Sequence, residues 1–408
     1  MLSHEQKKVI IIFIVVTLVL ITLGINIVPE IMGRAYFSNK SVPPSIHSPA
    51  DISADLKQIT RDNAGRLEEI SKISQTGDGF VVDMAESADS KKLLAVYGNG
   101  TFISWNIIEN TITLNGSFFV LKNNKEIDIA TLAISDITRQ VSFSQNGNWV
   151  LTPSEISPEG SIGFNIWDTN TAVRIDCFGE EEYCPNGGAF KYSGQVLHPT
   201  RDLYFNTLGH TVNGWYGFSR TRETGGSFNV RAAPDSTNVP QITRLAIDPL
   251  GDYLAIADSS GCIQLGDISE HKLPIQEEQY HGFSHEAKYC LSYQFNQVIN
   301  TTDIQLDETH SWIGWLTDEE LVIWSLKNYL FPLYMKMKIE NSNAIEFDKT
   351  GRILAIATSK GILLLDINSK AKITEYPVGK VTALHFSNDG RAMFWSDVNG
   401  NIHIWGVK

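Results

Sequence analysis

The chain has 408 residues, a formal net charge of −13 and a hydrophobic fraction of 42%. That apolar share excludes a globally disordered chain, because it is enough to build a sizeable core. Such an acidic surface repels phosphate backbones, and no block of Lys or Arg is interleaved with aromatic residues, so the composition argues against nucleic-acid binding.

Residues 9–28 form an uncharged apolar stretch near the start of the chain. The polar interruptions in its twenty residues are Thr17, Thr22 and Asn26. A helix of this length spans roughly 30 Å, the thickness of the hydrocarbon core of a bilayer. We therefore predict one transmembrane helix over 9–28. It is longer than the apolar run of a secretory signal peptide, so we expect an uncleaved signal anchor, with a removed signal peptide as the alternative.

The charges that flank this stretch predict its orientation. Lys7 and Lys8 precede it, whereas Arg34 and Lys40 follow it. Together with the short leading segment 1–8, this balance favours a cytoplasmic amino terminus and a single-pass membrane protein whose bulk is extracytoplasmic. The alternative is the same fold facing the cytoplasm.

A polar spacer is expected after the membrane stretch. Residues 29–62 include the run SNKSVPPSIHSPADISAD, which is rich in Ser, Pro and Asp and poor in large apolar side chains. Consecutive prolines stiffen such a segment, and its composition cannot pack a core. We predict a flexible stalk over 29–62 that separates the folded part from the bilayer.

The four cysteines are Cys177, Cys184, Cys262 and Cys290. They are too few for a disulfide-based scaffold, and both two bridges and four buried thiols are compatible with the sequence. Cys177 and Cys184 flank a short acidic loop, so a bridge between them is one prediction, with unpaired packing thiols as the alternative.

Internal repeats decide the fold of the remainder. Four segments align as an apolar strand followed by a polar turn that ends in glycine: 141–147, 245–251, 345–351 and 384–390. A second strand follows each turn, and in three copies a tight turn leads to a third strand, as in 362–366. Each unit therefore contains a three-stranded antiparallel meander.

Weaker copies extend the pattern to seven units. Their third strands end near residues 105, 167, 215, 266, 324, 365 and 405. Between consecutive units there is room for one outer strand, such as 372–376. A meander cannot bury both sheet faces alone, and radial stacking leaves few exposed edges. The predicted fold class is all-β: a seven-bladed β-propeller with four-stranded antiparallel blades over 63–408, preceded by one N-terminal transmembrane helix.

The ends of the third strands resemble those of the WD-repeat β-propeller family, whose repeats close with Trp-Asp. The positions that carry this repeat signature are Trp105, Trp167, Asp168, Trp215, Asp267, Trp324, Asp366 and Trp405. The copies lack the family's Gly-His dipeptide, so the family's Asp-His-Ser-Trp hydrogen-bond network is not expected, and a related propeller class is an alternative. We interpret each Trp as a packing residue between neighbouring blades.

The ring is expected to close by joining the two ends of the repeat region. The chain stops at Lys408, just after the third strand of the last unit. Residues 66–73, which precede the first unit, have the composition of a strand and can supply the missing outer strand. First and last segments would then lie side by side.

No sequence motif for catalysis or for a cofactor occurs in the chain. A nucleophile elbow, a zinc-protease helix, a phosphate-binding loop and a calcium loop are all missing from the sequence. His271, His281, His285 and Cys290 are too irregularly spaced to predict a metal site. The acidic run 180–182 is interpreted as a solvated loop. We predict no catalytic, cofactor-binding or metal-binding residue.

The sequence therefore predicts a membrane-tethered, non-catalytic propeller scaffold that binds a protein partner through its loops. The long inserts at 153–160, 179–188 and 271–288 are the expected recognition loops. The expected partners are an unidentified protein and, through the N-terminal helix, a membrane; nucleic acid is not among them. The alternative is an extracytoplasmic propeller enzyme or small-ligand receptor with its site in the central channel.

Overall fold

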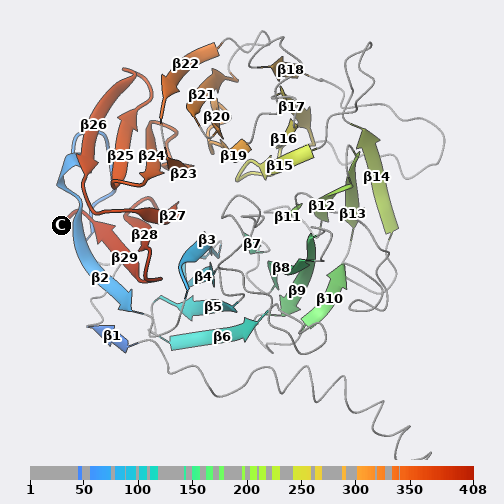
Figure 1. Ribbon diagram of the computed structural model, residues 1–408, viewed down its shortest axis with the longest axis horizontal. Coiled ribbons are helices and arrows are strands. Elements are labelled where there is room, and N and C mark those ends of the chain that lie inside the picture. The colour runs from blue at the N-terminus through green and yellow to red at the C-terminus, as the bar shows by residue number, and fades with distance from the viewer. Residues whose placement is uncertain are drawn as a thin grey trace, which may run out of the picture. The chain divides into compact units, whose positions relative to one another are not determined.

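The structure is a computed structural model of the chain (Figure 1). It describes residues 45–47, 56–74, 79–87, 89–97, 101–107, 111–117, 142–143, 149–156, 162–168, 174–178, 195–197, 203–208, 211–216, 223–229, 242–258, 262–268, 287–290, 301–317, 319–326, 333–339 and 341–408. The chain divides into two compact units, Met1–Ser41 and Val42–Lys408. All described residues belong to the second unit.

The strands of the second unit form antiparallel sheets whose strands follow one another in chain order. The first three sheets have four strands each. They consist of β3 (Val81–Glu86), β4 (Lys92–Tyr97), β5 (Thr101–Asn106) and β6 (Thr111–Ser117); β7 (Ser142–Phe143), β8 (Trp149–Ile156), β9 (Ile162–Asp168) and β10 (Arg174–Phe178); and β11 (Gln195–Leu197), β12 (Leu203–Leu208), β13 (Thr211–Tyr216) and β14 (Glu223–Asn229).

Three more sheets of four strands follow. They consist of β15 (Ile242–Ile247), β16 (Tyr253–Asp258), β17 (Cys262–Asp267) and β18 (Ala287–Cys290); β19 (Thr301–Leu306), β20 (Trp312–Thr317), β21 (Glu320–Ser325) and β22 (Leu333–Lys338); and β23 (Ser342–Phe347), β24 (Ile353–Thr358), β25 (Ile362–Asp366) and β26 (Ala371–Tyr376). The second strands that we predicted after the segments 245–251 and 345–351 are confirmed by β16 and β24, and the third strand predicted at 362–366 is confirmed by β25.

The last sheet joins the two ends of the propeller, and we call it the seam sheet. Its strands, from the inside outward, are β27 (Val381–Phe386), β28 (Ala392–Asp397), β29 (Ile402–Gly406), β2 (Glu68–Ser74) and β1 (Ser45–His47). The pairing of β2 with β29, for example Lys72 with His403, confirms the predicted closure by the segment before the first unit.

The inner strands follow one another around an axis, as Figure 1 shows. In chain order, β3, β7, β11, β15, β19, β23 and β27 each contact the next, and β27 contacts β3. Radial stacking of this kind hides both faces of each sheet against its neighbours, which single meanders cannot do. The second unit is therefore a closed all-β propeller.

Two irregularities of the strand register recur from sheet to sheet. The pairing of the inner strand shifts near its start, as between Ser342 and Ala344 in β23. The pairing of the outer strand shifts beside the end of the third strand, as between Ile323 and Trp324. Such bulges increase the local twist of a sheet, which lets wedge-shaped sheets pack around an axis.

The core lies between successive sheets and consists of aliphatic and aromatic side chains. Trp315, for example, is fully buried and stacks on Trp324, with ring centroids 5.6 Å apart. Burying a large apolar side chain contributes about 1.5–3 kcal/mol, so each face between two sheets stabilises the ring. Leu56, Ile59 and Leu67 are buried as well, and Ile59 and Leu67 pack with side chains of the seam sheet.

The predicted fold class needs correction, because the blades are not seven equivalent units of four strands. The described clusters of packed side chains join five blades: the β3–β6, β15–β18, β19–β22 and β23–β26 sheets and the seam sheet. The seam sheet also has five strands, because β1 pairs with β2. The spacing of the tryptophans predicts where the repeats lie, whereas the number of strands in a blade also depends on segments outside the repeats.

The expected transmembrane helix is also not part of the observed fold. Its residues 9–28, and the leading segment 1–8, lie outside the described residues. Among the residues that the structure does describe, no helix is both long enough and apolar enough to span a bilayer. The one helix described in the second unit is the short 3-10 helix η1 (Ala64–Arg66).

The predicted stalk over 29–62 ends earlier than expected. Residues 45–47 form β1, and the amide of Lys57 donates to the carbonyl of Val407 at 2.8 Å. The amide of Ile59 likewise donates to the carbonyl of Gly390. The apolar residues Leu56 and Ile59 are spaced within a polar segment, so composition alone concealed their packing.

Candidate functional site

The turn that joins the inner strand to the second strand has the same construction in five sheets. We number its positions from the first residue after the inner strand. The first position is Asp or Ser, at Ser87, Asp248, Asp307, Asp348 and Ser387. In each turn its side chain accepts an amide hydrogen from the sixth position, for example that of Ile353 by Asp348 at 2.6 Å. The first position therefore fixes the turn backbone.

The turns of the β19–β22 and β23–β26 sheets are matched almost atom for atom. Asp348 accepts hydrogen bonds from the amides of Thr350, Arg352 and Ile353 and from the Thr350 hydroxyl. Asp307 accepts the corresponding bonds from Thr309, Ser311 and Trp312. Both carboxylates are buried, and four donors satisfy each of them, so they stabilise the backbone rather than face a ligand.

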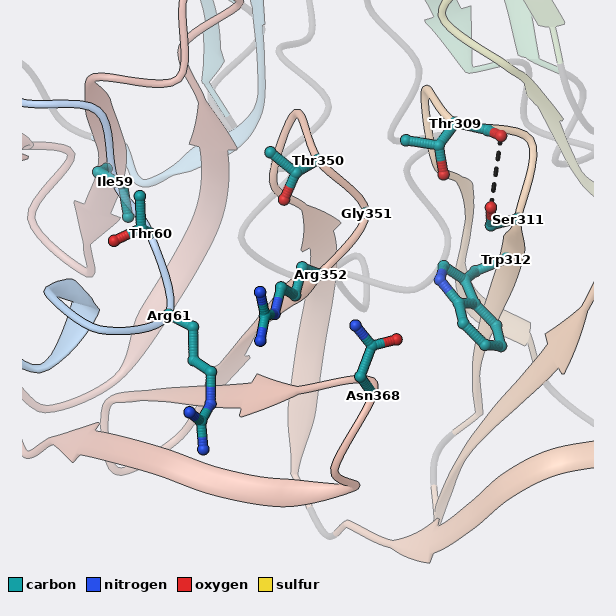
Figure 2. A pocket seen from close by; sticks show the side chains of 10 residues that line it. All are labelled: Ile59, Thr60, Arg61, Thr309, Ser311, Trp312, Thr350, Gly351, Arg352 and Asn368. Atoms are coloured by element: carbon teal, nitrogen blue, oxygen red, sulfur yellow. Dashed lines mark hydrogen bonds between the residues drawn. The ribbon is translucent and has the colours of Figure 1, made fainter.

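A pocket of about 270 Å³ lies where these two turns meet the segment 59–61 and the β25–β26 turn. Figure 2 shows the side chains around it, with Arg61 and Arg352 on one side and Trp312 on the other. The lining residues are Ile59, Thr60, Arg61, Thr309, Ser311, Trp312, Thr350, Gly351, Arg352 and Asn368. The pocket thus joins two guanidinium groups, an indole, an amide and several hydroxyls.

The two arginines of the pocket differ in their pairing. Arg61 forms an ion pair with Asp366, whose side chain is almost fully buried. Burial alone would raise the pKa of the Asp366 carboxyl, but hydrogen bonds from Ser369 and the charge of Arg61 outweigh it and lower the pKa. Arg352, by contrast, forms no ion pair with any residue of the described part of the chain. Its guanidinium is the charge available to a ligand.

The glycine of the pocket is required by its backbone and by its neighbour. Gly351 has φ +63°, and a Cβ there would lie 2.2 Å from Oδ2 of Asp307. The absence of a side chain therefore lets the β23–β24 turn approach the β19–β20 turn closely. This approach sets the shape of the pocket wall.

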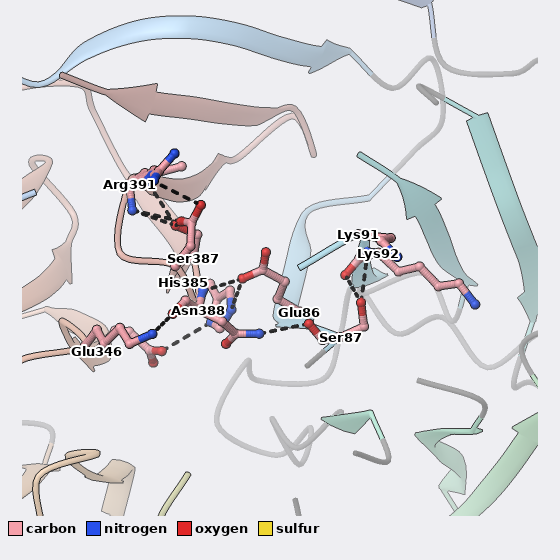
Figure 3. Close-up of polar contacts among 12 residues, drawn as sticks. Glu86, Ser87, Lys91, Lys92, Glu346, His385, Ser387, Asn388 and Arg391 are labelled. Atoms are coloured by element: carbon pink, nitrogen blue, oxygen red, sulfur yellow. Dashed lines mark hydrogen bonds and ion pairs between the residues drawn. The ribbon is translucent and has the colours of Figure 1, made fainter. Parts of the chain in front are cut away.

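A second polar cluster links three inner strands. His385 of β27 lies between Glu346 of β23 and Glu86 of β3, as Figure 3 shows. Nδ1 of His385 is 3.2 Å from Glu346 and Nε2 is 3.8 Å from Glu86. Glu86 also accepts the amide hydrogen of Asn388 at 2.6 Å. The three side chains come from three sheets, so they brace the ring near its axis.

The charge of this cluster follows from its burial. Burial would lower the pKa of His385, but the nearby carboxylates of Glu346 and Glu86 outweigh it and raise the pKa to about 10. His385 is therefore an imidazolium at neutral pH. A cation that both carboxylates hold on opposite sides suits a structural brace.

The predicted signature residues lie at matching places in the third strands, although the structure does not test their role. Trp105, Trp167, Trp324 and Trp405 are buried, and Trp215 lies at the equivalent position of β13. Asp168 and Asp267 end β9 and β17, and Asp366 ends β25. Of these signature residues, Asp366 is the one that the structure brings to the pocket, through its ion pair with Arg61.

Two tryptophans of the third strands, Trp105 and Trp405, lie among apolar side chains of a neighbouring sheet. Trp105 shares a cluster with Ile404 of the seam sheet, and Trp405 packs in a T-shaped contact with Tyr376 of β26. The indole nitrogens of Trp105 and Trp405 are buried with no hydrogen-bond partner among the described residues.

The predicted disulfide and recognition loops lie mainly outside the described residues. Cys177 is in β10, whereas Cys184 is not described, so their bridge stays a prediction. Cys262 is disulfide-bonded, and β18 places Cys290 opposite it in the strand register. Of the inserts, 179–188 lies outside the described part. Residues 153–156 belong to β8, and 287–288 belong to β18.

Comparison with known proteins supports the fold and adds no family. The chain is similar to the crystal structure of the beta-propeller domain of Cps50 (Swd1) from Myceliophteria thermophila. The TM-score is 0.58 at 13% sequence identity, over 84% of this chain and 100% of that domain. At this identity the likeness shows the β-propeller fold alone. No known family profile matches the chain. No curated protein matches it at a significant level.

The pocket is not predictable from the sequence, although one signal points toward its turns. The aligned segments 245–251, 345–351 and 384–390 all carry Asp or Ser at the fourth residue, which is the first turn position. That signal identifies the turns, whereas the meeting of Arg352 with the distant segment 59–61 has no local trace in the sequence.

Proposed function

We propose that the chain is a non-catalytic β-propeller that binds a protein partner, and that the pocket of Figure 2 receives an acidic side chain of that partner. The observation that carries the proposal is the guanidinium of Arg352, which lines the pocket without an ion pair to any described residue. Arginine binds carboxylates with two parallel hydrogen bonds, so it suits this role.

The surroundings of Arg352 support the same ligand. Arg61 adds a second guanidinium, and the amide of Asn368 adds further donors. The nearby carboxylates of Asp307 and Asp348 already accept four hydrogen bonds each. A volume of about 270 Å³ accommodates one or two side chains rather than a folded surface. The partner therefore presents a short acidic segment.

The test is selection of peptides from a random display library by the purified chain. We expect the selected peptides to be enriched in Asp and Glu, and Arg352→Glu to abolish that enrichment. Arg391→Glu is the matched control, because Arg391 holds the same fifth turn position in the seam sheet and lies outside the pocket. Equal enrichment by the chain and by Arg352→Glu would disprove the role of the pocket.

The alternative function, a ligand site near the propeller axis, has one observation in its favour. Glu86, Glu346 and His385 converge there from three sheets, and the last two are partly exposed. Because His385 is held by carboxylates on both sides, we favour a structural role for it. Binding of a small ligand that Glu346→Gln abolishes, with Arg352→Glu unaffected, would support the alternative instead.

The cellular location stays a prediction. We propose a membrane-associated, extracytoplasmic location for the propeller, and the disulfide of Cys262 supports the extracytoplasmic part, because disulfides persist in oxidising compartments. Protease treatment of intact and of permeabilised cells tests it. We expect the protease to digest the propeller in intact cells. A cytoplasmic marker protein is the control, and it should be digested only after permeabilisation. Digestion of the propeller only after permeabilisation, like the marker, would contradict the proposal.

A further inference from the structure

A cluster of potential metal ligands lies at the junction next to the pocket. Asp248 and Asp252 belong to the β15–β16 turn, and His310 belongs to the β19–β20 turn of the neighbouring sheet. One ligand atom of each residue lies within 4.8 Å of the other two. Nε2 of His310 is 2.6 Å from Oδ2 of Asp248 and 3.8 Å from Oδ2 of Asp252.

Of the three side chains, Asp248 is held in place by the main chain, whereas His310 and Asp252 are reached by solvent. Asp248 is fully buried, and its two oxygens accept the amide hydrogens of Tyr253 and Leu250. His310 packs edge-on against the ring of Tyr253, with centroids 5.2 Å apart. The side chains of His310 and Asp252 are 25% and 37% exposed, so an ion can enter from solvent and keep bound water.

The cluster arises where two turns depart from the repeat. The fourth turn position has a positive φ and is glycine in three of the five turns, at Gly251, Gly351 and Gly390. His310 adopts φ +52° there, although a side chain in this region costs roughly 1–2 kcal/mol. The fifth position is basic in three turns, at Lys91, Arg352 and Arg391, but it is Asp252 in the β15–β16 turn.

These two departures meet each other across the junction. A residue with a side chain that adopts an unfavourable positive φ is a reason to look for a role of that side chain. Here Nε2 of His310 lies 2.6 Å from Oδ2 of Asp248 and 3.8 Å from Oδ2 of Asp252, and His310 and Asp252 are both unusual for their turn positions. A simple ion pair needs one of these two changes, whereas a metal site needs both.

We propose that Asp248, Asp252 and His310 bind a divalent transition-metal ion, with zinc as the best fit, and thereby link two neighbouring blades. One imidazole nitrogen and two carboxylate oxygens form a ligand set that zinc accepts, and the remaining positions take water. With metal–ligand distances of about 2.0–2.2 Å, the ligand atoms of a tetrahedral ion lie roughly 3.3–3.6 Å apart. Nε2 of His310 and Oδ2 of Asp248, now 2.6 Å apart, therefore separate by somewhat less than about 1 Å when the ion binds. Magnesium, which prefers oxygen ligands, binds more weakly.

The ion replaces the hydrogen bond between His310 and Asp248. Nε2 of His310 must offer its lone pair to the metal, so a proton on that nitrogen leaves when the ion binds. Zinc binding is therefore expected to weaken as the pH falls, because protons compete with the ion for the ligand atoms. The main-chain donors of Tyr253 and Leu250 keep Asp248 in place throughout.

The test compares zinc binding by the full chain, without an affinity tag and stripped by a chelator, with binding by His310→Gly. Isothermal titration with ZnCl2 should show a site that His310→Gly weakens at least tenfold and that MgCl2 fills more weakly. Thermal unfolding should shift to higher temperature with ZnCl2 in the chain and not in His310→Gly. Asp252→Asn should weaken the same site.

The variant His310→Gly is suited to this test because glycine is the usual residue at its turn position, so loss of folding is not expected. Ser90→Gly changes the same position of the β3–β4 turn, which holds no ligand cluster among the described residues, and serves as the matched control. The proposal is wrong if the chain and His310→Gly bind ZnCl2 equally, if neither binds it, or if MgCl2 binds as tightly.

Discussion

Two neighbouring junctions of the propeller are built from the same turn and differ in what they offer to a ligand. At the junction of the β15–β18 and β19–β22 sheets, Nε2 of His310 lies near carboxylate oxygens of Asp248 and Asp252. At the junction of the β19–β22 and β23–β26 sheets, Gly351 lies close to Asp307, and Arg352 lines an open pocket. The first junction is acidic and suits a cation, whereas the second offers guanidinium groups and suits an anion.

The comparison shows that different turn positions stabilise the fold and contact a ligand. In both junctions a buried Asp at the first turn position accepts main-chain hydrogen bonds and holds the backbone. The fourth and fifth positions carry the side chains that differ, and these point toward the neighbouring sheet. Changes at the first position should therefore affect stability, and changes at the later positions should affect binding.

Replacing a first-position carboxylate should have the largest effect. Asp307→Ala removes the carboxylate that accepts the buried amides of Ser311 and Trp312, and we expect it to lower the free energy of unfolding by about 4 kcal/mol. Urea denaturation measures this. Asp389→Ala, in the seam-sheet turn, removes a half-exposed carboxylate and should cost about 1 kcal/mol or less. Similar losses for both variants would show that the turn carboxylate is not the organising group.

Near the axis, His385 lies between two carboxylates, and we predict how its contribution to stability changes with pH. His385 has a raised pKa of about 10, so its stabilisation is complete below its unfolded value near 6.5 and is lost as the pH rises through 10. We expect the chain to lose on the order of 3 kcal/mol of stability between pH 6.5 and 10 relative to His385→Gln. Urea denaturation at several pH values measures the difference.

If the stability of the chain and of His385→Gln changed in parallel above pH 6.5, the brace between Glu86 and Glu346 would be refuted.

A side chain at the glycine of the second junction should have a smaller effect. Gly351→Ala combines a positive φ with a contact to Asp307, and we expect a loss of about 2 kcal/mol together with a narrower pocket. Gly379→Ala is the control: φ is +86° there, and no atom lies within 4 Å of the added Cβ. It should cost about 1 kcal/mol from the backbone alone. Equal losses in urea denaturation would mean that the turns do not meet as closely as described.

The sequence predicted the strands and turns of the propeller well. Alternating apolar residues predict β16 and β24, and the glycines that end the aligned segments predict turns. In the structure Gly251, Gly351 and Gly390 lie in these turns with a positive φ. The composition of 66–73 predicted that it pairs with β29 as β2. These features depend on residues close together in the chain, so their signals are local.

The sequence failed where composition hides packing. A segment rich in Ser and Pro was predicted as a stalk up to residue 62, yet Ile59 is buried and Arg61 reaches Asp366. The prediction of four strands in every blade was wrong for the seam sheet, because β1, which comes from that same segment, adds a fifth strand. A few apolar residues in a polar segment do not raise the mean hydropathy of that segment enough to predict burial.

By itself, the sequence determined the repeating meander, the turn chemistry and the pairing that closes the ring, because strand alternation and the conformations of turn residues are set by near neighbours in the chain. Only the tertiary structure decided which side chains meet at the junctions. His310 meets Asp248 across 62 residues, and Glu86 faces His385 from the far end of the chain. Such contacts depend on how the sheets stack, which the order of residues within one repeat does not encode.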